Sequence, residues 1–298
     1  MLDLTIVIIT KNEEKNLKKC IESFNGIAKR IVIVDSYSSD GTKTLCEKMK
    51  SDNNISFYEH KFINHSEQLN WAFKNTNINT TWTMRMDADE ELTPELVNEL
   101  QKKLPKIASD VNGIILKRRV YFMGRWIKHG GKYPELLLRI FRTGFGECEQ
   151  KFMDEHLIIK SGNTIKFDED IIDNNNKHLE WWTNKHNWYS NKEVEDYQGK
   201  LDVTLDNSSE SLMDESIIKG QAERKRFIKN NGYYKLPLFF RAHIYFIYRY
   251  YVRLGFLDGK EGKIYHFLQA YWYRFLVDAK IYECEKFNIE MEGQGDLK

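Results

Sequence analysis

Two aspartates separated by one residue, Asp87 and Asp89, directly follow an apolar run that predicts a buried strand. Because side chains alternate along an extended chain, both carboxylates lie on the same side of it. Mg²⁺ and Mn²⁺ take a few hard oxygen ligands and complete their shells with water and substrate phosphates. The pair therefore predicts a divalent-cation site that neutralises phosphate groups. The alternative is an acidic cluster at the start of the helix that Thr93 caps.

Polar residues also follow two earlier apolar runs. The first run, 4–10, ends in Thr10-Lys-Asn-Glu13, and the second, 31–35, leads into a polar turn that contains Asp40. Ligands bind outside the carboxyl ends of the strands in an open α/β sheet, so we expect these residues to line one site with the acidic pair. No G-x-G-x-x-G or G-x-x-x-x-G-K-[ST] motif occurs, which disfavours dinucleotide binding and a Walker-type NTPase. An EF-hand is excluded, because Leu92 stands where that loop requires glycine.

A parallel sheet is needed to bring these residues together, and the first 110 residues predict one. Apolar strands at 4–10, 31–35, 55–58 and 82–86 alternate with helical patterns, the first of them at 12–24. This alternation predicts a doubly wound sheet with helices on both faces. Thr93 is the expected N-cap of a helix that has Pro94 at its first position. Later strands are expected at 114–120 and 136–141, and the chain after Tyr233 is helical and aromatic.

Composition narrows the class of protein. The chain has 298 residues, of which 41% are hydrophobic and 30% charged, so we expect a globular protein with one or two domains. Forty-five basic and 44 acidic residues nearly cancel, which gives no indication of nucleic-acid binding. Four separated cysteines indicate buried thiols in a reducing compartment. Neither a signal peptide nor an apolar run of the ~18–20 residues that span a bilayer is evident, so a cytoplasmic protein is expected.

Several motifs, taken in order, resemble family 2 glycosyltransferases of the GT-A fold. They are Ile8-Ile-Thr-Lys-Asn-Glu-Glu-x-Asn-Leu17, Ile33-Val-Asp-Ser-x-Ser-x-Asp-Gly-Thr42, Gln68-x-Asn70-Trp-Ala72 and Met86-Asp-Ala-Asp-Glu90. The runs 251–262 and 269–280 are similar to the tail of bacterial enzymes that build lipopolysaccharide core or other surface glycans. The resemblance covers nearly the whole chain.

The resemblance implies a GT-A-like, mostly parallel sheet with a C-terminal helical extension. The catalytic domain would occupy residues 1–200, with a nucleotide-binding half at 1–90 and an acceptor half at 91–200, and the extension would occupy 201–298. The implied activity is inverting transfer of a sugar from a nucleotide diphosphate donor, expected to be a UDP-sugar, to a glycan or lipid-linked acceptor in lipopolysaccharide or surface-polysaccharide synthesis. The implied cofactor is Mn²⁺ or Mg²⁺.

Site residues follow from the same resemblance. Thr10, Asn12 and Glu13 would line the nucleotide pocket, and Asp35 and Asp40 would contact the base or ribose. The remaining donor-side residues are Gln68 and Asn70 near the base, Asp87 at the ribose and metal, and Asp89 as the main metal ligand. Ser36 stands where many relatives have a second aspartate, which leaves the donor base open. Asp35 as a helix cap and Glu13 as a first-turn charge are the alternatives.

Inverting transfer needs a carboxylate that takes the proton of the acceptor hydroxyl, and it must come from the acceptor side. The family similarly places an acidic pair after the metal motif, and we expect Asp154 first and Glu155 second to be this base. The alternative is a solvated acidic loop. Lys185 and His186 would hold the diphosphate, and His178 would complete the metal shell, although a single histidine is more often structural. Nearby tryptophans could stack on sugar faces.

Two further segments have open interpretations. The Gly-rich stretch 124–131 fits either a flexible lid or a surface hairpin. In the tail, Phe240, Ile244, Ile247, Tyr251 and Leu254 share one arc of a helix, and Arg241, Arg249 and Arg253 share roughly the opposite arc. Either the tail docks peripherally on the inner membrane, where a lipid-linked acceptor would be presented, or its apolar face packs on the catalytic domain or another subunit of a homo-oligomer.

Two other functions compete with sugar transfer. A nucleotidyltransferase shares the sheet and the metal, but it usually carries a Gly-rich N-terminal loop that Thr10-Lys-Asn-Glu13 lacks. A catalytically silent glycan-binding or scaffold protein would keep the fold without the chemistry.

Overall fold

The computed structural model describes residues 1–24, 26–149, 156–199 and 232–288, which belong to two compact units. The first unit comprises Met1–Arg119 and Glu135–Asn176, and the second comprises Val120–Pro134, 177–199 and 232–288. The predicted boundary at residue 200 stays a prediction, because it falls outside the described residues. Cys20, Cys46, Cys148 and Cys284 are all buried, as predicted, and none of them forms a disulfide with another described residue.

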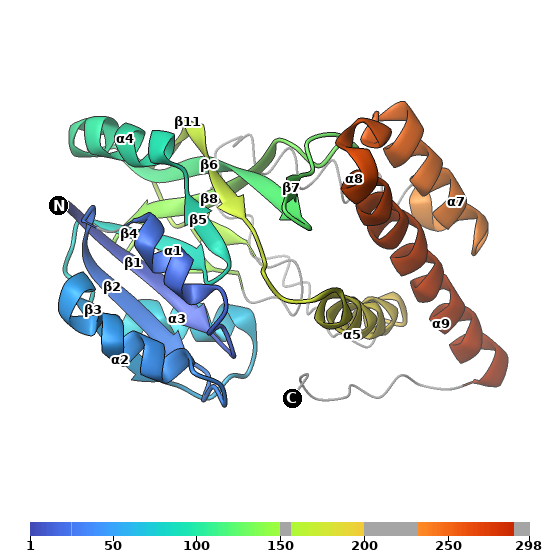
Figure 1. Cartoon of the computed structure of the whole chain (residues 1–298), viewed down its shortest axis with the longest axis horizontal. Coiled ribbons are helices and arrows are strands. Elements are labelled where there is room, and N and C mark those ends of the chain that lie inside the picture. The colour runs from blue at the N-terminus through green and yellow to red at the C-terminus, as the bar shows by residue number, and fades with distance from the viewer. Residues whose placement is uncertain (25, 150–155, 200–231, 289–298) are drawn as a thin grey trace. The chain divides into compact units, whose positions relative to one another are not determined.

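Parallel strands form the N-terminal half of the first unit. β1 (Leu2–Thr10), β2 (Ala28–Asp35), β3 (Ile55–Glu59) and β4 (Trp82–Asp87) lie in the order β3-β2-β1-β4 (Figure 1). α1 (Leu17–Ser23), α2 (Thr42–Asn53) and α3 (His65–Asn75) connect them. The four predicted strands are confirmed. They are continuous apolar runs because a parallel sheet is covered on both faces.

Alternate residues of these strands pack on opposite layers of helices. Ile6 and Ile8 belong to a core with α1, α2 and α4 (Pro94–Lys103), whereas Val7 and Val34 pack with α3. Figure 1 shows α1 and α2 on one face of the sheet and α3 on the other. The doubly wound α/β fold is therefore confirmed. The N-cap at Thr93 is confirmed as well, since its Oγ1 accepts a hydrogen bond from the Leu96 amide at 3.1 Å.

The second half of this sheet is antiparallel. β8 (Glu135–Arg142) pairs with β4 and with β6 (Val111–Phe122), and β11 (Asn163–Asp173) and β5 (Glu90–Leu92) complete the order. β9 (Gly146–Cys148) and β10 (Leu157–Ile159) form a separate two-stranded sheet, and η1 (Leu104–Lys106) is a 3₁₀ turn. The sequence predicted β6 and β8 but not β5, which has three residues and pairs with β11, some 80 residues later.

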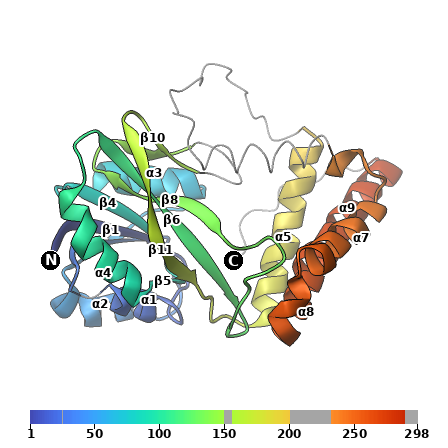
Figure 2. The ribbon, with the colours of Figure 1, turned by 90° about the horizontal axis from the view of Figure 1, so that it is seen from above.

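Helices dominate the second unit. α5 (Leu179–Tyr197) packs on α9 (Tyr273–Phe287) through Val194, Val277 and Ile281 (Figure 2). η2 (Tyr233–Lys235) precedes α7 (Phe240–Ile247), which continues into the π-helical turn η3 (Tyr248–Val252). η4 (Gly255–Asp258), α8 (Gly259–His266) and the π-helical η5 (Phe267–Trp272) then lead to α9, and β7 (Arg125–Trp126) pairs with the end of β6. The predicted helical tail is confirmed. None of the helices in the described ranges has the length and apolar character needed to traverse a bilayer.

Candidate active site

Three adjacent strands end at the same edge of the parallel sheet. Thr10 of β1 lies opposite Asp35 of β2, and Ile9 lies opposite Asp87 of β4. This register brings Thr10, Asp35 and Asp87 together, as the sequence predicted from the polar residues that follow each apolar run. The edge is therefore the candidate active site.

Asp35 is the centre of a hydrogen-bond network at this edge. Its carboxylate accepts hydrogen bonds from Thr10 Oγ1 at 2.7 Å, from the Ser38 amide at 2.6 Å and from Ser38 Oγ at 2.6 Å. The side chain is almost fully buried. These bonds fix the turn after β2 against the end of β1, so Asp35 shapes the loop. Direct contact between Asp35 and a nucleotide stays a prediction.

The loop after β1 is joined to the turn after β2. The Asn12 amide donates to Ser38 Oγ at 2.8 Å, and Asn12 Oδ1 accepts from the Ser39 amide at 2.8 Å. Asn12 has a φ of 56°, a left-handed conformation that asparagine tolerates better than most residues. The Glu13 amide donates to Thr42 Oγ1 at 2.9 Å. These bonds explain why α1 begins at Leu17 and not near residue 12, as its periodicity predicted.

Asp40 fixes the same turn directly before α2, whose N-cap is Gly41. Its Oδ1 accepts from the Thr42 amide at 3.0 Å and from Thr42 Oγ1 at 2.5 Å, and its Oδ2 accepts from the Glu14 amide at 3.2 Å. Asp40 itself is exposed. It can therefore hold the loop and still face solvent, and its predicted nucleotide contact is untested.

Gln68 and Asn70 of α3 make structural bonds in the described residues. Gln68 is fully buried; its Nε2 donates to Ser36 Oγ at 3.1 Å and its Oε1 lies 2.8 Å from His60 Nδ1. Asn70 exchanges two hydrogen bonds with the backbone of Cys148, at 2.8 and 2.9 Å. Asn70 thus holds β9 beside α3. The predicted positions of both residues near a base stay predictions.

A buried ionic network surrounds Asp87. Arg139 Nη2 lies 3.1 Å from Asp87 Oδ2, and Arg85 Nη2 lies 3.3 Å from Asp87 Oδ1. Arg139 also forms an ion pair with Glu90, which is fully buried and accepts the Asp87 amide at 3.0 Å. Arg118 adds a second guanidinium, whose Nη1 lies 3.8 Å from Glu90 Oε1.

This network separates the pKa values of the two carboxyls. Burial by itself would raise the pKa of Asp87, but the Arg139 and Arg85 guanidiniums outweigh burial and hold that pKa well below its usual value. Burial raises the pKa of Glu90 to about 8, since Arg139 offsets burial only in part and Asp87 repels a second negative charge. Asp87 is therefore the ionised member of the pair at neutral pH.

Asp89, unlike Asp87, has no ion pair with an arginine among the described residues. It is partly exposed, and its Oδ2 accepts a hydrogen bond from Asn175 Nδ2 at 2.8 Å. The backbone oxygen of Asp89 accepts from the Asn174 amide at 2.9 Å, which ties the acidic turn to the end of β11. One oxygen of this carboxylate thus has no hydrogen bond among those described.

The donor set can be compared with what a divalent cation requires. No group of three or more His, Cys, Asp or Glu side chains with metal-binding geometry occurs in the described parts of the chain. Both oxygens of Asp87 already face guanidiniums, whereas Asp89 does not. The residues therefore fit an ion held by one or two carboxylates that completes its shell with substrate oxygens and water, as Mg²⁺ does.

Sequence reasoning missed the basic side of this network. Arg139 was not singled out, although it interrupts the apolar run 136–141 of a strand with a predicted buried face. A charge within a buried strand needs a countercharge, since an unpaired one is costly. That signal indicates a buried acidic partner, but it does not identify Glu90 or Asp87.

The predicted residues of the acceptor side belong to the second unit or lie outside the described residues. Asp154 and Glu155 fall in the segment 150–155, which the structure does not describe. His178 is exposed and stands at the N-cap of α5. Lys185 Nζ lies 4.8 Å from the centre of the Trp181 ring.

His186 packs within the second unit as an uncharged ring. It stacks on Trp182 with 3.5 Å between ring centres, and its Nδ1 lies 2.8 Å from the Trp182 backbone oxygen. Burial lowers the pKa of His186 to about 4. Because the Trp182 carbonyl takes the single N–H of the uncharged ring at Nδ1, Nε2 is an acceptor, and only a protonated His186 could donate a hydrogen bond to the predicted diphosphate.

The Gly-rich stretch 124–131 is attached to the helical tail of the second unit. The His129 amide donates to Asp258 Oδ2 at 2.9 Å, and His129 Nδ1 lies 2.6 Å from Asp258 Oδ1. The Gly130 amide donates to the Arg253 backbone oxygen at 2.8 Å. These bonds favour a fixed hairpin, the second of the two interpretations, over a free lid.

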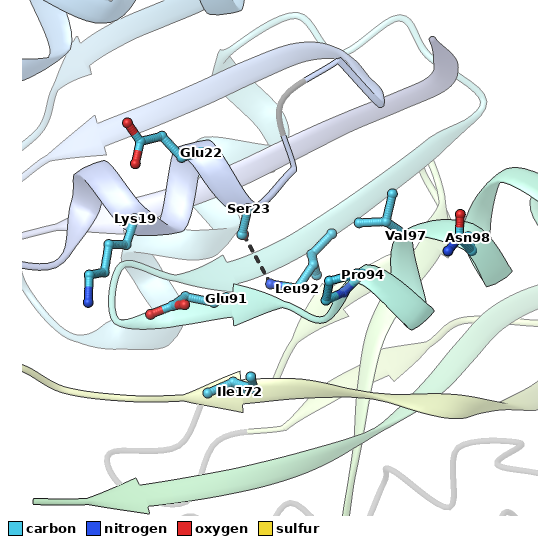
Figure 3. A pocket seen from close by; sticks show the side chains of 9 residues that line it. All are labelled: Lys19, Glu22, Ser23, Glu91, Leu92, Pro94, Val97, Asn98 and Ile172. Carbon is cyan, nitrogen blue, oxygen red and sulfur yellow. Dashed lines mark hydrogen bonds between the residues drawn. The ribbon is translucent and has the colours of Figure 1, made fainter. Parts of the chain in front are cut away.

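A surface hollow of the first unit lies apart from all of the predicted site residues. Figure 3 shows the side chains that line it, which come from α1, β5, α4 and β11. Ser23 Oγ accepts the Leu92 amide at 3.0 Å and joins α1 to β5 there. Because none of the predicted site residues lines this hollow, we assign the chemistry to the strand ends and not to it.

Comparison with known proteins points to one family of enzymes. The model of the family described as glycosyl transferase family 2 matches residues 5–163. The lipopolysaccharide core biosynthesis glycosyltransferase LpsC of Rhizobium meliloti is 27% identical over 95% of this chain and 93% of its own length. An uncharacterised glycosyltransferase of Rickettsia bellii is 31% identical over 33% of this chain and 31% of its own.

The fold has a counterpart among solved structures. A mannosyltransferase of Pyrobaculum calidifontis, in complex with GDP-Man and Mn²⁺, aligns with a TM-score of 0.54 and 12% identity. The alignment covers 94% of this chain and 87% of that chain. This likeness confirms the predicted GT-A-like fold.

Proposed function

Because the chain belongs to glycosyl transferase family 2, we propose that it is an inverting hexosyltransferase that uses a UDP-sugar. The acceptor is a glycan or a lipid-linked glycan in the synthesis of lipopolysaccharide or another surface polysaccharide. The similarity to a lipopolysaccharide core enzyme over nearly the whole length supports this choice. The protein is cytoplasmic and acts peripherally at the inner face of the membrane.

One observation carries the proposal: the register that places Thr10, Asp35 and Asp87 at one edge of the sheet. Ligands of open α/β sheets bind at this edge. In the proposed donor pocket, the loop fixed by Asn12, Glu13 and Asp40 lies beside the nucleotide, with Gln68 and Asn70 on the base side. Asp87 accepts a hydrogen bond from the ribose, since its ionised state is maintained by Arg139.

In the proposed reaction, the acceptor hydroxyl attacks the anomeric carbon on the side opposite the diphosphate. Asp154 is the first candidate, and Glu155 the second, for the base that takes the hydroxyl proton as the new C–O bond forms. The bond between the anomeric carbon and the diphosphate oxygen breaks, and the nucleoside diphosphate leaves with its electron pair. The configuration at that carbon is thereby inverted.

Asp89 and Asp87 are the proposed carboxylate ligands of a Mn²⁺ or Mg²⁺ ion, with His178 as a further ligand. When bound, such an ion stabilises the negative charge that grows on the diphosphate. Lys185 and His186 are proposed to contact the diphosphate oxygens, Lys185 through its ammonium group and His186 through Nε2 when the ring is protonated. A homo-oligomer is compatible with all of these roles.

Nucleotide-dependent thermal stabilisation tests the donor site without an acceptor. We expect a UDP-sugar near saturation to raise the melting temperature by ~5–10 °C in the presence of Mn²⁺, and Asp89→Asn to abolish the metal-dependent part. Glu47→Gln, which changes an exposed carboxyl of α2, is the matched control. Stabilisation that needs no metal and survives in Asp89→Asn would contradict the proposed metal site.

Turnover of the variants tests the base. Asp154→Asn should reduce transfer by ~10²-fold or more while nucleotide stabilisation stays intact, and Glu155→Gln should have the smaller effect. Full activity in both variants would place the base elsewhere. Nucleotide binding without transfer to any acceptor would favour a silent glycan-binding protein.

A further inference from the structure

The helix α7 and the turn η3 that follows it expose their apolar side and bury two arginines, the reverse of a normal surface helix. All five apolar residues of the predicted arc are exposed, by 58% at Phe240, 51% at Ile247 and 57% at Tyr251, for example. Arg241 and Arg249 of the opposite arc are buried instead. A surface helix of a globular protein normally directs its apolar side to the core.

The buried arginines are held by partners within the unit. Arg241 Nη2 lies 2.5 Å from Asp278 Oδ1, and Arg249 Nη1 donates to the Tyr245 hydroxyl at 2.9 Å. These two guanidiniums are therefore unable to contact lipid headgroups. The membrane interpretation of the sequence had given them that role. Of the three predicted arginines, only Arg253 is exposed.

Apolar exposure continues beyond α7 onto neighbouring elements. Val252 is 66% exposed, and Phe256 and Leu257 of η4 are 44% and 49% exposed. η3, η4 and α8 pack on one another, and Phe256 contacts the Tyr250 ring edge-on with 6.3 Å between centres. Figure 1 shows α7 and α8 as neighbours in this unit. So much exposed apolar surface indicates an interaction site.

The charges around this surface have one sign. In the described stretch 240–267, the exposed residues with Lys or Arg side chains are Arg253, Lys260 and Lys263, and no Asp or Glu there is exposed. Of the acidic residues there, Asp258 is buried, and Glu261 is partly buried with its carboxylate 3.8 Å from Arg125. None of the three exposed cations has an ion pair with another described residue. The surface therefore complements an anionic partner.

A second copy of the chain is a poor partner for this surface. In a two-fold dimer the same patch faces itself, so Arg253, Lys260 and Lys263 would approach their own copies. Like charges brought together without acidic partners disfavour association. An anionic bilayer meets both requirements, because it offers apolar depth for aromatic and aliphatic side chains and phosphate for the cations around them.

A basic hollow lies at the margin of this surface. Its lining combines cationic, polar and apolar side chains, with Lys128, His129, Tyr133 and Arg253 beside Val252 and Leu254. The Asp258 carboxylate fixes the His129 ring, and the backbone bond from Gly130 to Arg253 joins its two walls. Because His129 Nδ1 is bound to Asp258, Nε2 is the ring nitrogen that remains for a ligand of the hollow. The group that fits is a phosphate attached to an apolar chain.

We propose that this surface, composed of the exposed apolar residues of 240–257 and the basic hollow at Lys128, His129 and Arg253, docks the enzyme on an anionic phospholipid bilayer. The hollow receives a lipid phosphate, and the apolar side chains enter the boundary between headgroups and acyl chains. This inference rests on the proposed function, to which it adds the surface and the class of lipid.

Co-sedimentation with vesicles tests the proposal on the full-length protein. Wild type should bind vesicles with about 30 mol% phosphatidylglycerol at least tenfold more tightly than pure phosphatidylcholine vesicles, and added salt should weaken binding. Ile247→Ser/Tyr251→Ser and Lys128→Glu/Arg253→Glu should each reduce binding to the anionic vesicles at least tenfold.

Matched variants of the first unit serve as controls. Ile63→Ser/Phe145→Ser removes two exposed apolar side chains there, and Lys102→Glu/Lys106→Glu reverses two exposed cations there. Both should bind vesicles like wild type. Equal loss in these controls, equal binding to neutral vesicles, or a stable dimer that Ile247→Ser/Tyr251→Ser converts to monomer would overturn the proposal.

Nucleotide stabilisation separates this test from that of the proposed function. The two docking variants should keep the UDP-sugar shift of wild type, and Asp89→Asn should keep vesicle binding. Lost vesicle binding with an intact nucleotide shift is the expected signature of the docking variants. Wild type that shows the nucleotide shift but binds no vesicle refutes docking alone, and the converse refutes the donor site alone.

Discussion

The strand-end edge of the first unit and the helix pair of α7 and α9 in the second unit each contain an arginine–aspartate ion pair. The two ion pairs stabilise surfaces of opposite character. At the edge, Arg139 neutralises Asp87 and contacts Glu90, and the apolar side chains of the strands are inside. In the helix pair, Asp278 neutralises Arg241, and apolar side chains of α7 are outside. In the first unit, ion pairs therefore support a polar site, whereas in the second they support an apolar one.

The difference shows that a buried ion pair does not by itself locate a functional surface. At the edge, the arginines contact Asp87 and not Asp89. The Asp89 carboxylate, which accepts one described hydrogen bond, from Asn175, is therefore available to a ligand. In the helix pair, Arg241 and Asp278 neutralise each other. The surface that remains available to a partner is the apolar arc of α7. Variants that remove each ion pair, and then the groups around it, can test this contrast.

The largest effect is expected from Arg139→Met. Removal of this guanidinium leaves the ionised, partly buried Asp87 with less countercharge and takes the charged partner from the buried Glu90, which should lower the free energy of unfolding by about 3–5 kcal/mol. Denaturant unfolding measures it, and Lys102→Met, at an exposed lysine, provides the baseline. A loss below about 1 kcal/mol would mean that Arg118 and Arg85 compensate and that the network is not centred on Arg139.

Asp278→Ala is the corresponding change in the second unit. It leaves Arg241 buried without a charge partner and removes the acceptor of the Phe239 amide, which is bound at 2.7 Å. We expect a loss of about 3 kcal/mol, and amide hydrogen exchange should accelerate in α7 but not in α3. Glu285→Ala, at an exposed carboxyl of α9, is the control. Faster exchange in both helices would argue against separate units.

The pH dependence of stability should report on Glu90 of the first unit. The pKa of Glu90 is raised to about 8 in the folded protein, so native Glu90 binds a proton more tightly than unfolded Glu90. Its contribution is complete below the unfolded pKa and disappears as pH rises through about 8, a loss on the order of 2 kcal/mol between about pH 6 and pH 9. Glu90→Gln should flatten this slope, measured by urea unfolding. An unchanged slope would assign it to another group.

The smallest effect is expected at the apolar arc itself. Ile247 is 51% exposed, and Ile247→Ala should change the free energy of unfolding by less than about 0.5 kcal/mol. Ile33→Ala, the same substitution at a fully buried residue of β2, should cost about 2–5 kcal/mol. Similar losses in the two variants would mean that the arc is covered in the folded protein and is not a surface.

Much of the first unit could be predicted, because its signals are local. Each buried strand is an apolar run with a polar end, and a parallel order aligns those ends, which placed Thr10, Asp35 and Asp87 together. The hydrogen-bond partners of the site residues could not be predicted in the same way. Nothing in the local sequence indicates that Asn70 holds the backbone of Cys148 or that Asn175 contacts Asp89. The predicted roles of these residues toward a nucleotide or metal stay predictions.

The sequence by itself determined which residues share a face: the strand ends of the sheet and the arc from Phe240 to Leu254. Tertiary structure decided which face is inside and which charges are neutralised. Periodicity is a local property, whereas the partners that settle burial are distant in the chain. Asp87 and Arg139 are 52 residues apart, and Arg241 and Asp278 are 37 apart. Only folding brings such groups close enough for their charges to fix the orientation of a helix or the pKa of a carboxyl.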